Sequence, residues 1–132
     1  MTYRIIKVLI LDDGTQFTER LLEQCELGLN EFGIKARVVT SPEEAYSCVR
    51  SWSPEVIIFD AHTLLAHSFE LVSRWKEAAF VIVTSDVHNS ELEKRVLDAG
   101  ASAYLVKPYE ADEYERLLDE MIQFVPTLPS AQ

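Results

Sequence analysis

Five side chains in this sequence could together carry phosphoryl-transfer chemistry. Three are the carboxylates Asp12, Asp13 and Asp60, and with them stand the hydroxyl of Thr84 and the ammonium of Lys107. Converging carboxylates repel one another, and a hard divalent cation such as Mg²⁺ relieves that repulsion because it prefers oxygen ligands. A lysine can balance the charge of an incoming phosphoryl group, and a hydroxyl can hydrogen-bond one of its oxygens. The set is suited to transfer of a phosphoryl group to a carboxylate.

Four of these residues end or directly follow an apolar run, and Asp13 stands next to Asp12. Most of the runs are nearly continuous and rich in Val and Ile, which predicts strands covered on both faces in a parallel sheet, whereas the second is more polar and suits an edge. The runs are 5–11 (IIKVLIL), 35–40 (KARVVT), 55–59 (EVIIF), 80–84 (FVIVT) and 103–107 (AYLVK). Because ligands of such sheets bind outside the carboxyl ends of the strands, we expect the five residues to lie together.

The segments between the runs carry helical periodicity and helix signals. The stretch SPEE predicts a helix start with Ser41 as N-cap, and SELE predicts another with Ser90 as N-cap. Gly33 and Gly100 stand where helix C-caps are expected. Strand and helix therefore alternate, which predicts a doubly wound α/β domain: a five-stranded parallel sheet with helices on both faces. We place this domain at residues 1–125 and a short tail at 126–132.

Composition limits the partners and the compartment. The 132 residues include 22 acidic and 12 basic side chains, and the formal net charge of −10 argues against direct binding to nucleic acid or to an anionic membrane. A cation or a basic partner fits better. The N-terminal run is too short and too charged for a secretory signal, and no stretch is long enough to span a bilayer, so we expect a cytoplasmic protein. Cys25 and Cys48 lack metal-site spacing and are expected to be buried free thiols.

The stretch LDDGT allows a different interpretation, as the nucleophile motif of haloacid dehalogenase-type phosphatases. That motif is D-x-D-G-T, and its nucleophile would stand two residues before Asp13, where this chain has Leu11. The later acidic pair of that family is missing as well. We therefore assign Gly14 and Thr15 to the loop that leads into the first helix.

A second resemblance covers residues 5–125. The segments LDD, SPEVIIFD, VIVTSD and GASAYLVKPYE resemble the receiver domains of two-component response regulators. The resemblance implies a flavodoxin-like strand order of 2-1-3-4-5. It implies that Asp60 is the phosphoacceptor and that Asp13, Asp60 and the backbone carbonyl of His62 bind Mg²⁺ directly. Asp12 would act mainly through metal-bound water.

The same resemblance implies roles for the other strand ends. Thr84 would contact the phosphoryl group, and Lys107 would be its cationic partner. Tyr104 would be the aromatic switch that turns inward once Thr84 is drawn to the phosphoryl group. The Lys107–Pro108 peptide bond would be cis and would aim the lysine into the site. We expect Tyr109 to pack beside Pro108, with a place on a partner surface as the alternative.

The resemblance further implies a phosphorelay function. A histidine kinase, a phosphotransfer protein or a small phosphodonor would phosphorylate Asp60, and the protein would catalyse its own hydrolysis without turning over an external substrate. A downstream protein would bind the face formed by the fourth helix, fifth strand and fifth helix, which could also form a homodimer. One alternative stays open. The segment DAHTLLAHSFELV lacks the usual Pro and Gly, so the chain could be a pseudo-receiver, a constitutive protein-interaction module that is not phosphorylated.

Overall fold

The computed structural model describes residues 4–12, 15–27, 32–61 and 68–124. Within these ranges strands and helices alternate along the chain, as the apolar runs predict. The elements are β1 (Arg4–Leu11), α1 (Thr15–Leu27), β2 (Phe32–Val39), α2 (Pro42–Trp52), β3 (Val56–Asp60), α3 (Ser68–Trp75), β4 (Phe80–Ser85), α4 (Ser90–Ala99), β5 (Ala103–Val106) and α5 (Ala111–Phe124). The residues at 126–132 that we assign to a tail lie outside the described ranges.

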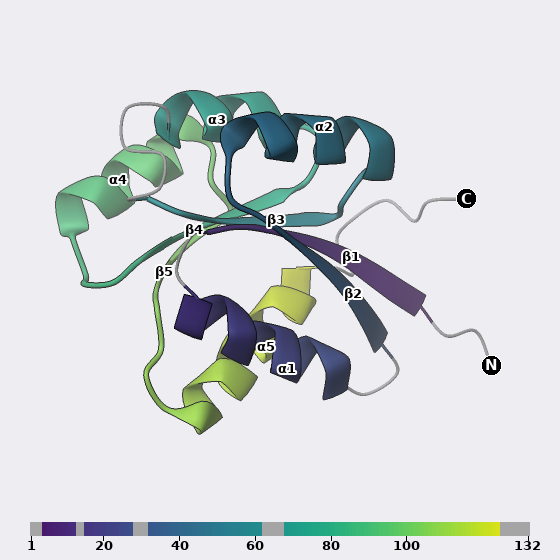
Figure 1. Ribbon diagram of the computed structural model, residues 1–132. Helices are drawn as coiled ribbons and strands as arrows, with labels where there is room; N and C mark the ends of the chain where they lie inside the picture. Colours follow the sequence, from purple (N-terminus) through teal and green to yellow (C-terminus); the bar gives the residue numbers. More distant parts are fainter. Residues whose placement is uncertain (1–3, 13–14, 28–31, 62–67, 125–132) are drawn as a thin grey trace.

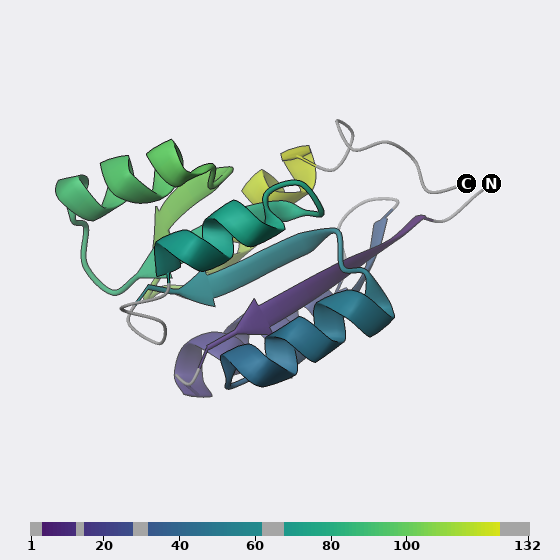
Figure 2. The same cartoon turned by 90° about the horizontal axis from the view of Figure 1, so that it is seen from above.

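The strands form one parallel sheet in the order β2-β1-β3-β4-β5, which confirms the predicted order and the edge position of the polar second strand. Helices α2, α3 and α4 cover one face of the sheet, and α1 and α5 cover the other (Figure 1). From above, α2, α3 and α4 follow one another across their face (Figure 2). The carboxyl ends of the strands therefore meet along one open edge between two helical layers.

Two apolar cores hold the helices to the sheet. Leu9, Ile57 and Phe59 point into the core beneath α2, α3 and α4. Ile10 and Ile58 point into the core above α1 and α5. Because neighbouring residues of one strand face opposite layers, both must be apolar, and every residue of β3 is buried. The burial of both faces explains why the central runs lack the alternating pattern of a half-exposed strand.

The helix starts follow the predicted caps with one shift. Ser41 caps α2, because its Oγ accepts the N–H of Glu44 at 3.2 Å. The cap of α4 is Asn89 and not Ser90, and the Oδ1 atom of Asn89 accepts the N–H of Leu92 at 3.0 Å. The Ser90 prediction is wrong by one residue because an asparagine, an equally good N-cap, stands directly before it.

The two glycines predicted as C-caps have different outcomes. Gly33 is not a cap, since it lies inside β2 and pairs with Ile5 of β1. Gly100 is the C-cap of α4 and has a φ of 117°, in the left-handed region that side chains avoid. A Cβ atom there would also collide with the Cδ atom of Lys76, although that flexible side chain can move.

We predict that Gly100→Ala lowers the free energy of unfolding by about 1–2 kcal/mol, the cost of holding a side chain at positive φ. Urea denaturation of both proteins measures this difference. Asp98→Ala, an exposed change in the same helix, is the matched control and should stay within about 0.5 kcal/mol of the parent protein. A Gly100→Ala protein as stable as the control would contradict the cap assignment.

Both cysteines are buried free thiols, as predicted. Burial, helped by the negative charge of Glu26, raises the pKa of Cys25 to about 12, so its reactive thiolate form is rare at neutral pH. Among the described residues, no helix combines the length and the apolar character needed to cross a membrane.

Candidate functional site

The carboxyl ends of the strands bring four of the five predicted residues together. Asp12 follows β1, Asp60 ends β3, and Asp60 pairs in register with Thr84 of β4. Lys107 follows β5. Asp12, Asp60 and Thr84 are 2%, 4% and 0% exposed, so this polar group is buried at the sheet edge. The predicted convergence is confirmed for these four, whereas Asp13 and His62 lie outside the described residues.

The ammonium of Lys107 lies between two buried carboxylates. Its Nζ atom is 2.9 Å from Oδ2 of Asp12 and makes a closer ion pair with Oδ2 of Asp60. A third carboxylate, that of the exposed Asp86, lies 3.8 Å away. Burial acts to lower the pKa of Lys107, but the hydrogen bonds and charges of Asp60 and Asp12 outweigh it and raise that pKa. The lysine is therefore a fixed cation at neutral pH.

The donor set fits a hard divalent cation. Asp12 and Asp60 direct carboxylate oxygens at one point, and together they carry one more negative charge than Lys107 neutralises. Oxygen ligands of this kind, completed by waters, are the ligands that Mg²⁺ prefers. No cluster of three or more His, Cys, Asp or Glu side chains that could hold a metal occurs within the ranges the structure describes. A complete Mg²⁺ site would thus need ligands beyond these two aspartates, and Asp13 and His62 are the predicted ones.

The Lys107–Pro108 peptide bond is not cis, which corrects the prediction for Pro108. The described residues contain no cis peptide bond. The backbone N–H of Lys107 donates to the carbonyl of Ser85 at 2.9 Å and fixes the end of β5 beside β4. From there the side chain reaches both aspartates with the trans bond, which X–Pro sequences favour by about 0.5–1 kcal/mol.

Thr84 is tied to the strand that carries Asp60. Its Oγ1 atom donates to the carbonyl of Phe59 at 3.3 Å, and its own carbonyl accepts the N–H of Ala61 at 2.9 Å. The residues before and after Asp60 are thus both bonded to Thr84. Its contact with a phosphoryl group stays a prediction.

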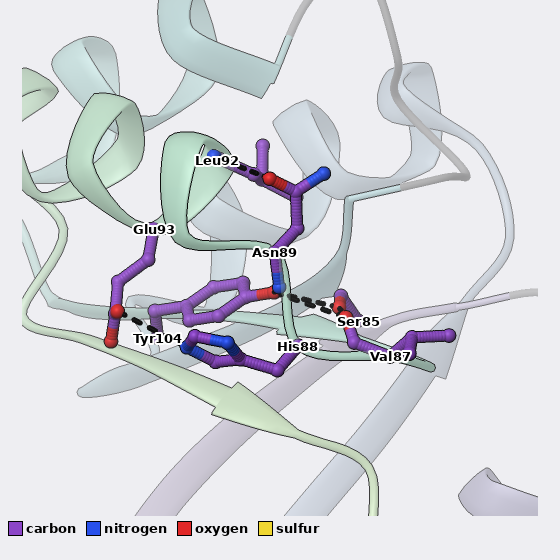
Figure 3. A network of polar contacts seen from close by, with 7 residues as sticks. All are labelled: Ser85, Val87, His88, Asn89, Leu92, Glu93 and Tyr104. Carbon is purple, nitrogen blue, oxygen red and sulfur yellow. Dashed lines mark hydrogen bonds and ion pairs between the residues drawn. The ribbon is translucent and has the colours of Figure 1, made fainter.

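Tyr104 is turned inward, and its hydroxyl joins β5 to the loop between β4 and α4 (Figure 3). The oxygen lies 2.8 Å from Oγ of Ser85 and accepts the backbone N–H of Asn89 at 3.1 Å. It also donates to the carbonyl of Val87 at 3.3 Å. The ring takes this place while Thr84 is bonded to Phe59, so coupling of Tyr104 to Thr84 stays a prediction.

Ser85 is a residue that sequence reasoning missed. It is 2% exposed, and its hydroxyl makes a close hydrogen bond to the carbonyl of Val87 as well as the contact with Tyr104. The sequence signal for this role was the position of Ser85, a hydroxyl residue directly after Thr84 at the end of an apolar run. The hydroxyls of Ser85 and Tyr104 together connect the end of β4 to Asn89, the residue that caps α4.

We predict that Ser85→Ala loosens this network. The variant should be about 1 kcal/mol less stable than the parent protein because it lacks the buried hydroxyl. The amide of Asn89 should also exchange its hydrogen faster in the variant. Hydrogen exchange with mass spectrometry and urea denaturation measure the two effects. Ser51→Ala, which changes an exposed hydroxyl on α2, should leave the Asn89 amide unchanged. Equal exchange in both variants would show that Ser85 does not hold the loop.

Tyr109 does not pack beside Pro108 as expected, because its side chain is 75% exposed. Its backbone is fixed on both sides: the N–H donates to Glu113 at 3.1 Å, and the carbonyl accepts from Nη1 of Arg20 at 3.1 Å. This backbone leaves the ring in solvent, where a partner could contact it. A cavity of about 300 Å³ lies beside the loop.

Comparisons with known proteins agree with this architecture. No protein-family model matches the sequence. A curated relative, the chemotaxis protein CheY of Halobacterium salinarum, is 28% identical over 107 residues, which are 79% of this chain and 87% of the relative. The similarity thus extends over most of both chains.

Solved structures share the fold at lower identity. A response regulator from Thermotoga maritima has a TM-score of 0.78 at 20% identity and covers 90% of this chain and 98% of its own. An atypical orphan response regulator, described as having a phosphorylation-independent regulatory mechanism, has a TM-score of 0.72 at 21% identity, with 90% and 97% covered. The Mn²⁺-bound response regulator Rcp1 has a TM-score of 0.72 at 13% identity, with 96% and 99% covered. At such identities the likeness shows the fold alone.

Proposed function

We propose that this chain, which has the fold of a response regulator receiver domain, accepts a phosphoryl group on Asp60 in a Mg²⁺-dependent reaction and signals by changing its protein contacts. The observation that carries the proposal is the pair of buried carboxylates, Asp12 and Asp60, that converge on the ammonium of Lys107. A carboxylate buried beside a fixed cation is a suitable nucleophile for a negatively charged phosphoryl group, because the cation offsets the repulsion between the two.

The reaction forms one bond and breaks one. A carboxylate oxygen of Asp60 attacks the phosphorus of the donor, and the bond from phosphorus to the leaving group breaks with its electron pair on the leaving group. Lys107 balances the charge of the transferred oxygens, and Thr84 exchanges its bond to Phe59 for one to a phosphoryl oxygen. Hydrolysis by water later restores the Asp60 carboxylate and releases inorganic phosphate. Apart from the phosphodonor, no external substrate is turned over.

Mg²⁺, when bound, would add further charge balance on the transferred oxygens. We assign its direct ligands to Asp13, Asp60 and the backbone carbonyl of His62, with Asp12 acting through bound water. The buried oxygens of Asp12 and Asp60 support this assignment, and the Mn²⁺-bound form of one protein of this fold is consistent with it.

The hydroxyl network carries the signal away from the site. A shift of Thr84 would move Ser85 next to it, and Ser85 contacts Tyr104, whose hydroxyl holds the amide of Asn89 at the start of α4. This route leads to the face formed by α4, β5 and α5, where we place the downstream protein and a possible homodimer. The exposed side of α5 is acidic, which favours a basic partner over nucleic acid; its charged residues are Asp112, Glu113, Glu115, Arg116, Asp119 and Glu120.

We place the upstream donor, a histidine kinase or a phosphotransfer protein, at the open end of the site, and the reaction in the cytoplasm. A second candidate function is the pseudo-receiver, a constitutive interaction module. Two observations favour it: Tyr104 is held inward while Thr84 is bonded to Phe59, and one protein of this fold is described as phosphorylation-independent.

Intact-mass analysis after incubation with acetyl phosphate and Mg²⁺ distinguishes the two functions. The proposal predicts the gain of one phosphoryl group that hydroxylamine removes, as expected for an acyl phosphate. EDTA and Asp60→Asn should each prevent the gain. No gain at any time, together with no measurable Mg²⁺ binding, would exclude phosphorylation by this donor and favour the interaction module.

A further inference from the structure

Helix α1 contacts the loop after β5 at two points. The ring of Phe17 lies under the Lys107 ammonium, with 4.9 Å between Nζ and the ring centroid. One turn further along α1, Nη1 of Arg20 donates to the carbonyl of Tyr109 at 3.1 Å. The two residues are three positions apart and therefore share one face of the helix. Lys107 and Tyr109, their targets, stand on either side of Pro108.

The Phe17 contact is built into the core. Phe17 is 6% exposed, and its ring packs against Tyr114 of α5 with centroids 5.9 Å apart. The aromatic face attracts the ammonium, a cation–π contact that leaves the Lys107 hydrogen atoms directed at Asp12 and Asp60. The position of the ring is thus set by packing, independently of the site.

The Arg20 contact acts on the backbone. Its hydrogen bond joins residues 89 positions apart and spans the gap between α1 and the loop. Beside the loop lies the cavity of about 300 Å³, whose lining includes Phe17, Arg20, Lys107 and Tyr109. Because that space is open, the loop has room to shift if the Arg20 bond is removed. Lys107 would then lose its alignment with Asp60.

We propose that Arg20 is a positioning residue for the phosphorylation of Asp60. By holding the Tyr109 carbonyl it fixes the loop that carries Lys107, while Phe17 supports the ammonium from below, so that the cation already points at the acceptor when the donor arrives. This inference rests on the proposed function. In this proposal α1 directs the Lys107 side chain at the site, a role that we had expected a cis bond before Pro108 to have.

The test is a double-mutant cycle on the rate of phosphorylation by acetyl phosphate with Mg²⁺. Arg20→Ala should slow the reaction about tenfold, because displacing a charged group from its working position is costly. In a Lys107→Ala background the same change should alter the remaining rate less than about twofold, since its effect passes through the lysine. Arg20→Lys should restore most of the rate, because a single hydrogen bond to a carbonyl needs one donor and not a planar fork.

Glu23→Ala, one turn further along α1 on an exposed position, is the matched control and should not change the rate. An Arg20→Ala rate equal to that of the parent protein would overturn the proposal. So would an equal slowing in the presence and absence of Lys107, because it would show that Arg20 acts by another route.

Hydrogen exchange gives a readout that does not depend on phosphorylation. Arg20→Ala, but not Glu23→Ala, should speed exchange of the amides of Lys107 and Tyr109. If the parent protein accepts no phosphoryl group but these amides respond, the proposed function fails while the aiming of the loop by Arg20 stands. If the amides do not respond, Arg20 does not hold the loop and the inference fails by itself.

Discussion

Replacing Lys107 by alanine should slow phosphorylation of Asp60 by about 100-fold, the usual cost of removing one group that stabilises transition-state charge. The ammonium contacts both Asp12 and Asp60, and it is the cation placed to receive the charge of the transferred oxygens. The rate of acetyl phosphate incorporation at fixed Mg²⁺ measures the effect. Lys94→Ala, an exposed lysine of α4, is the control and should react at the parent rate. A Lys107→Ala rate within about threefold of the parent would remove the lysine from the mechanism.

The same substitution should change the dependence of stability on pH. The pKa of Lys107 is raised in the folded protein, so its pairing stabilises the fold fully below the unfolded pKa of about 10.4 and is lost as the pH rises through the higher folded value. In Lys107→Ala the charges of Asp12 and Asp60 face each other without that ammonium. We therefore expect the variant to be less stable than the parent at neutral pH, and the difference between the two proteins to shrink as the pH rises through the folded pKa of Lys107. Urea denaturation at several pH values measures this.

Asp12→Asn should lower the affinity for Mg²⁺ by about 10–100-fold, the range seen when a residue that holds metal-bound ligands is changed. The asparagine side chain has nearly the same shape and keeps one oxygen, but the substitution removes one of the two buried negative charges that converge in the site. Isothermal titration with Mg²⁺ measures the change.

Asp86→Asn is the matched control for this metal prediction. Asp86 carries the same charge close to the site, but its side chain is 60% exposed and lies 3.8 Å from Lys107. Its change should therefore cost much less affinity than that of Asp12. If both variants bind Mg²⁺ equally well, the ion does not bind through the buried carboxylates.

The fold and most of the site could be predicted because both follow from the strands. The central runs are apolar on both faces, which only a sheet between two helical layers accommodates. Because the strands are parallel, their carboxyl ends lie at the same edge of the sheet. The residues at these ends that lie together are Asp12, Asp60, Thr84 and Lys107. Residue type and position at a strand end were enough for this inference.

The contacts that could not be predicted depend on tertiary packing. Nothing in the stretch around Arg20 indicates that it would bond to a carbonyl 89 residues away. The trans bond before Pro108 and the exposed ring of Tyr109 follow from how that loop is held and not from its local sequence. Asn89, and not Ser90, caps α4. Both residues are good N-caps, and only the backbone conformation decides which of two neighbours takes the cap position.

Locating the phosphoryl group tests the central claim most directly. After reaction with acetyl phosphate and Mg²⁺, borohydride converts a phosphorylated aspartate to homoserine, and peptide fragmentation then reads the position. The account predicts homoserine at position 60, where the buried carboxylate meets Lys107. Homoserine at Asp12 or Asp86 instead, or a phosphoryl group on a histidine, would contradict it.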